Sequence, residues 1–299
     1  MNSKEQFETV KEGLLVLAPA KINLSLLIAG KRPDGFHDIE TVMAKVDFYD
    51  EILIEPGNKK GIELVCKGPH WAPEGKDNLV YQACEMLLNS RQSADIKITL
   101  TKNIPAGSGL GSASSDAAAT LIGIDKYLEF GLGNRQLAKL AERLGSDVAF
   151  FLDGPLALCT GKGEKITKIT KNFVFSALLI LPDVSVSTKK VYANYQHSSD
   201  VYKKLSVGIN SYIEKNRIDL VSEMRTNMLE ISCFSLYREL AELKARIESS
   251  GIGPLCLSGS GSALFFIIDS TEPEKALKNQ LKNTKNIGCT TIIVSNNRW

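Results

Sequence analysis

The first third of the chain carries apolar runs and alternations that predict β-strands. Residues 14–28 are almost entirely apolar, and Pro19 within this stretch predicts either two strands or one bent strand. Residues 39–46 and 51–55 continue the strand pattern, and residues 95–101 place apolar side chains on alternate positions. These segments predict a sheet in the first part of the chain.

Apolar residues at helical spacing follow in the middle and later parts of the chain. We expect helices over residues 78–89, 116–128 and 134–144, and a charged helical region up to about residue 249. Residues 252–268 then predict a strand, a Gly/Ser turn and a second strand.

Two further apolar runs, residues 173–181 and 289–294, predict strands of a second layer. The irregular mixture of strands and helices favours an α+β fold over a doubly wound parallel sheet. A change in composition places the domain boundary near residue 170. We therefore expect an N-terminal domain over residues 1–170 and a C-terminal domain over residues 171–299.

The composition narrows the function classes. The chain has 299 residues, 43% of them hydrophobic and 23% charged, with a net charge of +2. Its basic residues are dispersed, which argues against a general nucleic-acid or membrane binder. Six cysteines form no Cys-x-x-Cys pair, so neither a structural zinc site nor a disulfide framework is expected. Residues 1–8 lack a signal-peptide pattern and no apolar run could span a bilayer, so we expect a cytoplasmic protein.

The clearest chemical signal is a Gly/Ser-rich segment between the strand at 95–101 and the next helix. Its alternating glycines can adopt positive φ and bring backbone N–H groups close to an anion. The N-terminus of the helix adds its unpaired N–H groups and dipole, which favours a nucleotide phosphate as ligand. The candidate phosphate-binding residues are Pro105, Ala106, Gly107, Ser108, Gly109, Leu110, Gly111, Ser112, Ala113, Ser114 and Ser115.

The spacing of this loop excludes two familiar motifs. A Walker A loop requires Gly-Lys-Ser/Thr, but no lysine lies between Lys102 and Lys126. A dinucleotide fingerprint would need a third glycine where Ser112 or Ser114 stands. A hairpin or helix cap without ligand stays open, although a plain turn needs only one or two such residues. If the loop holds phosphates, a side chain at Gly109 should crowd them.

Four polar residues elsewhere could carry chemistry. Lys21 interrupts an apolar strand, so its charge is either used or turned outward. Asn23, two residues on, shares its face. Asp147 follows a helix stop at Gly145 and, from the residues alone, is more typical of a helix N-cap. His37 follows a turn, where a hydrogen-bonded loop histidine is the simpler interpretation.

Three separated segments together resemble the motifs of the GHMP small-molecule kinases. They are Pro19-Ala-Lys-Ile-Asn-Leu, the loop at 105–118 and the Leu-Ser-Gly-Ser-Gly-Ser turn at 257–262. The resemblance extends from about residue 16 to residue 268, and three ordered motifs are more specific than any one. Further matching strings lie at 30–41, 77–81, 144–151 and 227–230. The resemblance implies an α+β, two-domain fold with mixed and antiparallel sheets and an active site in the cleft between the domains.

The resemblance also implies an activity. Members of the family transfer the γ-phosphoryl group of ATP to an alcohol, with Mg²⁺ shielding the phosphates. Asp147 corresponds to the family's catalytic base, which accepts the hydroxyl proton. Lys21 would pair with Asp147 and favour the developing alkoxide. The ligands of Mg²⁺ are not fixed by the sequence: Ser112 is one candidate, and Asp116 is either another or a favourable charge at the helix N-terminus.

The string Gly-Phe-His-Asp at 35–38 is similar to family members that phosphorylate the 2-hydroxyl of a cytidine-diphosphate-linked methylerythritol. Asn23 would then hold the methylerythritol or diphosphate portion, and His37 would hydrogen-bond the cytosine edge. Phe36 stands where many relatives carry tyrosine, and its ring can still pack beside the base. The segment 182–188 resembles the family's substrate-side loop.

Several alternatives stay open. The turn at 258–262 borders either the phosphates or the acceptor, or it is a tight hairpin. Another GHMP kinase, acting on homoserine, mevalonate or a sugar, is the nearest rival. A non-catalytic nucleotide-binding protein is the second. We expect a monomer or weak homodimer whose partner is a small-molecule substrate, with no nucleic acid and no membrane.

Overall fold

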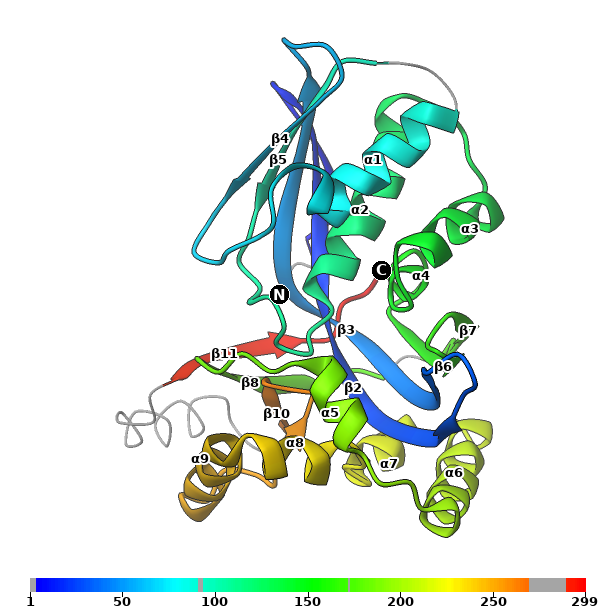
Figure 1. Ribbon diagram of the computed structural model, residues 1–299, viewed down its shortest axis with the longest axis vertical. Coiled ribbons are helices and arrows are strands. Elements are labelled where there is room, and N and C mark those ends of the chain that lie inside the picture. Colours follow the sequence, from blue (N-terminus) through cyan, green and yellow to red (C-terminus); the bar gives the residue numbers. More distant parts are fainter. Residues whose placement is uncertain (1–3, 91–93, 172, 269–288) are drawn as a thin grey trace.

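The computed structural model describes residues 4–90, 94–171, 173–268 and 289–299. Within these residues two β-sheets follow one another along the long axis of the molecule, and helices cover both (Figure 1). The first sheet contains β1 (Phe7–Val10), β2 (Gly13–Lys31), β3 (His37–Pro56), β4 (Ile62–Lys67), β5 (Ile96–Thr101), β6 (Leu156–Gly161) and β7 (Lys165–Lys168). The second contains β8 (Ser176–Pro182), β9 (Cys256–Leu257), β10 (Leu264–Ile268) and β11 (Cys289–Ser295).

The pairing of the strands is mixed in the first sheet and antiparallel in the second. The first sheet has the order β1-β2-β3-β5-β4, with β6 between β3 and β7. Only β4 and β5 pair in parallel among the described strands. The second sheet has the antiparallel order β11-β8-β10-β9. The α+β class with mixed and antiparallel sheets is thus confirmed.

Two long strands connect the halves of the molecule. The stretch with Pro19 is one bent strand, since β2 runs unbroken and its register against β3 shifts between Pro19 and Ala20. The two segments predicted around residues 39–55 likewise form the single strand β3. Residues 51–56 of β3 pair with β5, and residues 39–44 of β3 pair with β6. The bend therefore carries β2 and β3 from one half of the molecule into the other (Figure 1).

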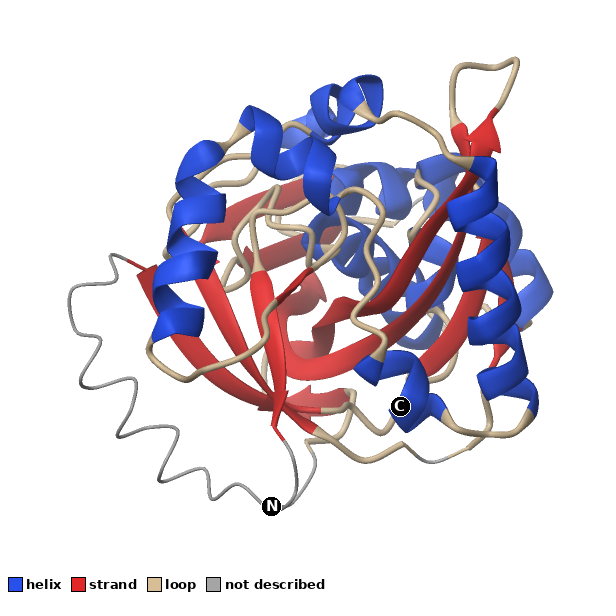
Figure 2. Cartoon of the chain, turned by 90° about the horizontal axis from the view of Figure 1, so that it is seen from below, coloured by secondary structure: helices blue, strands red, loops and turns tan. Residues whose placement is uncertain are grey.

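Helices pack on both sheets (Figure 2). On the first sheet lie α1 (Leu79–Ser90), α2 (Ser112–Tyr127), α3 (Asn134–Leu144) and α4 (Val148–Phe151), with the short 3₁₀ helix η1 (Gly75–Asp77) before α1. Around the second sheet lie α5 (Thr188–Asn194), α6 (Ser199–Glu214), α7 (Ile218–Glu223), α8 (Glu230–Leu236) and α9 (Arg238–Ser249). The helices predicted from apolar spacing are confirmed. Helix α2 begins at Ser112, four residues earlier than expected, inside the Gly/Ser-rich segment.

Three apolar clusters hold these layers together. One lies between the first sheet and α1–α4, and a second lies between the second sheet and α8 and α9. The third contains Ile22 and Val42 of the long strands together with Leu179 and Phe265 of the second sheet. The chain passes from one sheet to the other between β7 and β8, where the sequence predicts the domain boundary near residue 170. That boundary stays a prediction, because the third cluster draws on both sides of it.

No helix within the described ranges is both long and apolar enough to cross a bilayer. Of residues 1–8, which lack a signal-peptide pattern, residues 1–3 lie outside the described part of the chain.

Candidate active site

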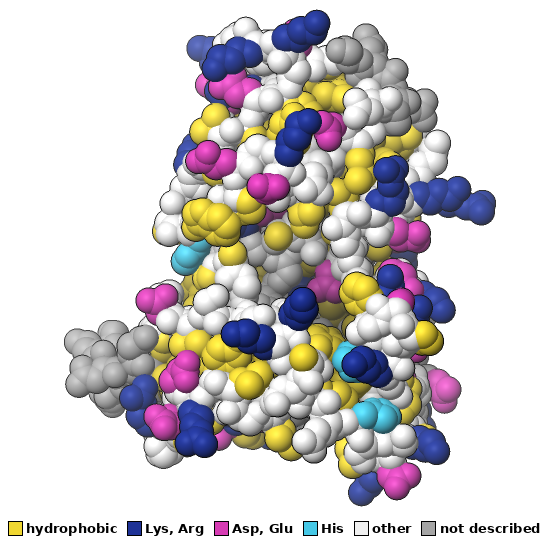
Figure 3. Space-filling view, viewed as in Figure 1, with side chains coloured by type: hydrophobic (Ala, Val, Ile, Leu, Met, Phe, Trp, Pro, Cys, Tyr) yellow, Lys and Arg dark blue, Asp and Glu magenta, His cyan; other side chains and the backbone are white. Residues whose placement is uncertain are grey.

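A cavity of about 890 Å³ opens where the two halves meet, and the space-filling view shows the surface hollowed there (Figure 3). It contains most of the site residues predicted from the sequence. Those that line it are Lys21, Asn23, Phe36, His37, Asp147, Pro105, Ala106, Gly107, Ser108, Gly109, Gly111, Ser112, Ala113 and Ser114. Leu110 and Ser115 do not line it, since the side chain of Leu110 packs in the apolar core and Ser115 is fully buried in α2.

The glycines of the loop at 105–115 are required by backbone conformation and by close contacts. Gly107, Gly109 and Gly111 have φ of 68°, 79° and 72°, a region that favours glycine. A Cβ on Gly109 would lie 2.1 Å from the carbonyl oxygen of Ser258. A side chain at Gly109 would therefore push away the second Gly/Ser turn, and the expectation that it would crowd the phosphates directly is corrected.

The N-terminus of α2 is free to bind an anion. Gly111 precedes the helix in a left-handed conformation, and no side chain caps it. Ala113 and Ser114, in the first turn of the helix, line the cavity, so the unpaired N–H groups of this helix end lie at its wall, where the dipole favours negative charge.

Lys21 lies inside the protein, which contradicts the outward-facing interpretation. The residue is 3% exposed, and Nζ donates to Oδ1 of Asn23 at 2.6 Å. The amide of Asn23 in turn donates to the hydroxyl of Thr41 at 2.8 Å. Burial lowers the pKa of Lys21, while the charge of Asp147 acts in the opposite direction. The expected pairing with Asp147 is therefore an interaction through space, because the structure shows no direct ion pair between the two side chains.

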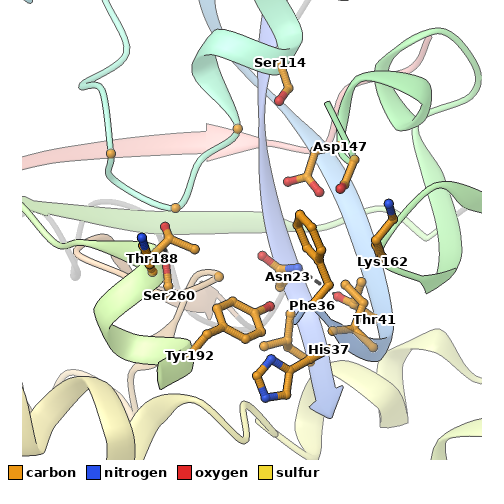
Figure 4. Close-up of a pocket in the computed structure, with 18 of the residues that line it drawn as sticks. Asn23, Phe36, His37, Thr41, Ser114, Asp147, Lys162, Thr188, Tyr192 and Ser260 are labelled. Atoms are coloured by element: carbon orange, nitrogen blue, oxygen red, sulfur yellow. Dashed lines mark hydrogen bonds between the residues drawn. The ribbon is translucent and has the colours of Figure 1, made fainter. Parts of the chain in front are cut away.

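Asp147 occupies the N-cap position of α4 without capping it. Its carboxylate accepts no hydrogen bond from the helix, and the side chain lines the cavity instead (Figure 4). A Cβ on Gly163 would lie 3.3 Å from Oδ1 of Asp147, so the turn between β6 and β7 lies close to this carboxylate. The N-cap interpretation is contradicted, and the carboxylate is available for a ligand.

The other end of the cavity is aromatic and basic. Phe36 is 55% exposed, and Nζ of Lys162 lies 4.9 Å from its ring centroid. The ring of His37 lies 5.3 Å from that of Tyr192 on α5, and both Phe36 and Tyr192 project into the cavity (Figure 4). Burial, followed by the charge of Lys31, lowers the pKa of His37.

Sequence reasoning missed Lys162 and Tyr192. A Gly-Lys-Gly sequence surrounds Lys162, and such a turn beside a predicted cleft was the signal that could have found it. Tyr192 carried no local signal. It reaches the cavity because α5 packs against α8 and brings Tyr192 beside His37 at the start of β3, and only the tertiary fold makes these contacts.

A buried charge cluster lies beneath the phosphate-binding loop. Lys102 contacts Asp50, Asp116 and the hydroxyl of Ser112, with 2.6 Å between its Nζ and Oδ2 of Asp116. Asp50 also accepts hydrogen bonds from the backbone N–H groups of Asn103 and Ile104 at 2.6 and 2.8 Å. Burial, opposed by Lys102 but reinforced by Asp50, raises the pKa of Asp116 well above its usual value.

The donor set near the loop suits Mg²⁺ held mainly by a nucleotide. No group of three or more His, Cys, Asp or Glu within the described part of the chain could hold a metal. Ser112 and Asp116, the two candidates named from the sequence, are already engaged with Lys102. Ser114 and Asp147 offer oxygens to the cavity (Figure 4). Mg²⁺ commonly takes one or two such ligands and completes its shell with phosphates and water.

Comparisons with known proteins agree with this architecture. Residues 78–155 match the family model "GHMP kinases N terminal domain", and residues 209–287 match "GHMP kinases C terminal". The chain is 36% identical over 270 residues to 4-diphosphocytidyl-2-C-methyl-D-erythritol kinase of Geobacillus sp. (strain WCH70), covering 90% of this chain and 93% of that one. A crystal structure of 4-(cytidine 5'-diphospho)-2C-methyl-D-erythritol kinase superposes with a TM-score of 0.74 at 28% identity, covering 95% of this chain and all of that one. Homoserine kinase from Cytophaga hutchinsonii shares the fold, with a TM-score of 0.74 at 22% identity over 99% of this chain and 98% of that one.

Proposed function

Because the chain belongs to the 4-diphosphocytidyl-2-C-methyl-D-erythritol kinases of the GHMP kinase family, we propose that it phosphorylates the 2-hydroxyl of this cytidine-diphosphate-linked alcohol with ATP. The product would serve non-mevalonate isoprenoid precursor biosynthesis. One observation carries the proposal: a single cavity joins an uncapped helix N-terminus, a lysine–aspartate couple and an aromatic, basic end.

The loop at 105–114 and the start of α2 bind the phosphates of ATP. Backbone N–H groups approach the anion closely because the glycines hold left-handed conformations. The positive end of the α2 dipole adds to this attraction. The loop thereby fixes the direction in which the γ-phosphoryl group faces the cavity.

Asp147 and Lys21 act on the acceptor hydroxyl. The hydroxyl oxygen forms a bond to the γ-phosphorus, the bond between that phosphorus and the β–γ bridging oxygen breaks, and ADP leaves. The hydroxyl proton passes to the carboxylate of Asp147, which no helix N–H group occupies. The buried ammonium of Lys21 favours the negative charge that develops on the oxygen, and Asn23 fixes its position.

The aromatic end holds the cytidine diphosphate. Phe36 and Tyr192 line this end of the cavity, where a base can pack beside their rings, and His37 offers a hydrogen bond to its edge. Three lysines that line the cavity, Lys31, Lys162 and Lys189, supply positive charge for the diphosphate. A small acceptor such as homoserine would leave this end of the cavity without a partner.

Mg²⁺ completes the proposal as the cation that neutralises the transferring phosphates. Ser114 would hold it together with oxygens of the nucleotide. We place the reaction in the cytoplasm, in line with the unpaired cysteines of the described residues.

An ADP-release assay tests the function. We expect turnover with ATP, Mg²⁺ and the cytidine-linked alcohol, and none when EDTA removes the cation. Homoserine and mevalonate serve as competing acceptors under the same conditions. Efficient phosphorylation of either one, without turnover of the cytidine compound, would replace the proposed substrate. ATP binding with no turnover of any acceptor would favour the non-catalytic alternative.

A further inference from the structure

The second Gly/Ser turn, residues 258–262, contacts several parts of the active site at once. The hydroxyl of Ser258 donates to the carbonyl of Gly109 at 3.0 Å, and the backbone N–H of Ala263 donates to the carbonyl of Ser108 at 2.9 Å. The hydroxyl of Ser260 lies 2.8 Å from that of Thr188 at the start of α5. The turn therefore joins the phosphate-binding loop to the helix that carries Tyr192.

The same turn covers Lys21. A Cβ on Gly259 would lie 3.4 Å from Nζ of Lys21 and 3.3 Å from the carbonyl oxygen of Gly109. Gly259 also has a φ of 57°, which favours glycine. Any movement of this turn would change the space around the lysine that faces the reacting hydroxyl.

One side chain, that of Asn227, fixes the turn from the outside. Its Nδ2 donates to the carbonyl oxygens of Leu257 and Gly259, both at 2.8 Å. Its Oδ1 accepts from the backbone N–H of Leu229 at 2.9 Å. Both N–H groups of the amide thus donate to the turn and to Leu257 directly before it, while the amide oxygen is held by the segment of Asn227 itself.

The segment that carries Asn227 is held in place independently of the side chain. The backbone N–H of Leu26 donates to the carbonyl of Thr226 at 2.8 Å, and the N–H of Met228 donates to the carbonyl of Leu26 at 2.9 Å. These bonds fasten the segment to β2, the strand that contains Lys21. The amide of Asn227 therefore fixes the turn relative to β2. If the amide is removed, the backbone bonds still hold the segment around residue 227 on β2.

We propose that Asn227 is a positioning residue for phosphoryl transfer, which holds Gly259 against Lys21 and so keeps the ammonium aligned with the acceptor oxygen. This inference rests on the proposed function for its kinetic readout. Asn227 touches neither reacting group, and it acts through the turn. Misplacing a charged group by about 1 Å can lower the rate by roughly 100-fold, so the side chain should matter for turnover more than for binding.

Two variants and a matched control test the proposal. Asn227→Asp keeps the shape of the side chain and the bond from the N–H of Leu229. It replaces the donating NH₂ group by an oxygen, which cannot donate to the two carbonyl oxygens. Asn227→Ala removes all three bonds. Asn296→Asp is the control, because Asn296 is also half-buried, accepts from the N–H of Phe175 at 3.1 Å and donates to the carbonyl of Asn297 at 3.3 Å, away from the cavity.

In the ADP-release assay we expect kcat to fall roughly 10- to 100-fold in both Asn227 variants, with the KM for ATP changed less than about threefold. The control should keep a wild-type kcat, and melting temperatures should show that all three variants are folded. A kcat within about twofold of wild type in Asn227→Asp would overturn the proposal. An equal loss of kcat in the control at a similar melting temperature would overturn it too.

Hydrogen exchange gives a readout that needs no acceptor. The peptide containing residues 258–262 should exchange faster in both Asn227 variants than in wild type, and at the wild-type rate in the control. If the wild-type protein does not phosphorylate the cytidine-linked alcohol, the proposed function fails while this exchange still decides the role of Asn227. Unchanged exchange in both variants would contradict it.

Discussion

Single residues decide between the interpretations that the sequence left open. Asp147 stands where an N-cap is expected, yet its carboxylate faces the cavity and leaves α4 uncapped. Lys21 could have faced solvent, but the bulge after Pro19 turns it inward beside Asn23. Asp147 thus does not cap its helix and Lys21 does not face solvent, and such departures from local preference concentrate at functional sites.

Asp147→Asn tests the proposed role of Asp147 as general base. The amide keeps the shape of the side chain but does not accept a proton, so we expect kcat to fall by about 10²- to 10⁴-fold. The dissociation constant for ATP should change little, because the proposed phosphate contacts come from the loop at 105–114 and α2. Steady-state kinetics and a nucleotide titration measure the two effects separately. Full activity in the variant would remove Asp147 from the role of base.

Lys45 is a buried lysine outside the cavity, and its charge makes stability depend on pH. Nζ donates to the carbonyl of Phe151 at 3.1 Å, and burial lowers its pKa to about 7. Between pH 7 and 10.5 the unfolded chain binds the additional proton, so this residue makes stability rise with pH across that window.

Replacing Lys45 by Met should remove this contribution. The free energy of unfolding of wild type minus that of Lys45→Met should increase from pH 7 to pH 9.5, by at most about 1.4 kcal/mol per pH unit. Urea titrations at both pH values measure the difference, in which other titrating groups cancel. A difference that stays constant would mean that Lys45 is solvated in the folded protein.

At the scale of elements, local signals could be predicted and long-range ones could not. The phosphate-binding loop and α2 could be predicted from about twenty consecutive residues, because glycine conformation and helix spacing are local properties. Within that loop, however, Leu110 packs in the core, and no periodicity indicated this. Lys102 and Asp50 are 52 positions apart and meet only because β3 pairs with β5. Tyr192 enters the cavity through the packing of a helix for the same kind of reason.

The charge cluster under α2 predicts unequal roles for its two carboxylates. Asp116 has an oxygen without a hydrogen-bond partner and a raised pKa, so the folded protein retains a proton that the unfolded chain releases above pH 3.8. Stability from this residue therefore falls as pH rises from that value. We expect Asp116→Asn to match wild type near pH 4 and to gain stability relative to it at pH 7.5. Asp50→Asn should lose about 3–5 kcal/mol, because it removes one charged partner of the buried Lys102. Equal losses in both variants at pH 7.5 would contradict this division.

Across the whole molecule, residues 296–299 return from the second sheet to the first. Asn296 forms a bridge with Val46, and the backbone N–H of Asn297 donates to the carbonyl of Lys45 at 2.9 Å. Trp299 stacks on Tyr49 with 5.8 Å between ring centroids, and its indole N–H donates to the carbonyl of Lys4 at 2.9 Å. Together with β2 and β3, this segment couples the halves that form the cavity (Figure 1).

Trp299→Ala tests how much this return contributes to stability. The change removes the stacked ring from Tyr49 and uncovers Lys45, whose Nζ lies 6.0 Å from the Trp299 ring centroid. We expect a loss of about 1–3 kcal/mol in urea unfolding at pH 7.5, from lost apolar burial and ring contact. Trp71→Ala is the matched control: Trp71 is 74% exposed, and its removal should change stability by less than about 0.5 kcal/mol. Trp299 contacts Tyr49, Lys45, Asn297 and Lys4, which lie outside α2 and the loop at 105–114, so ATP affinity should stay at the wild-type value below the unfolding transition. Equal changes in stability in Trp299→Ala and Trp71→Ala would show that residues 296–299 contact β3 without stabilising the association of the two halves.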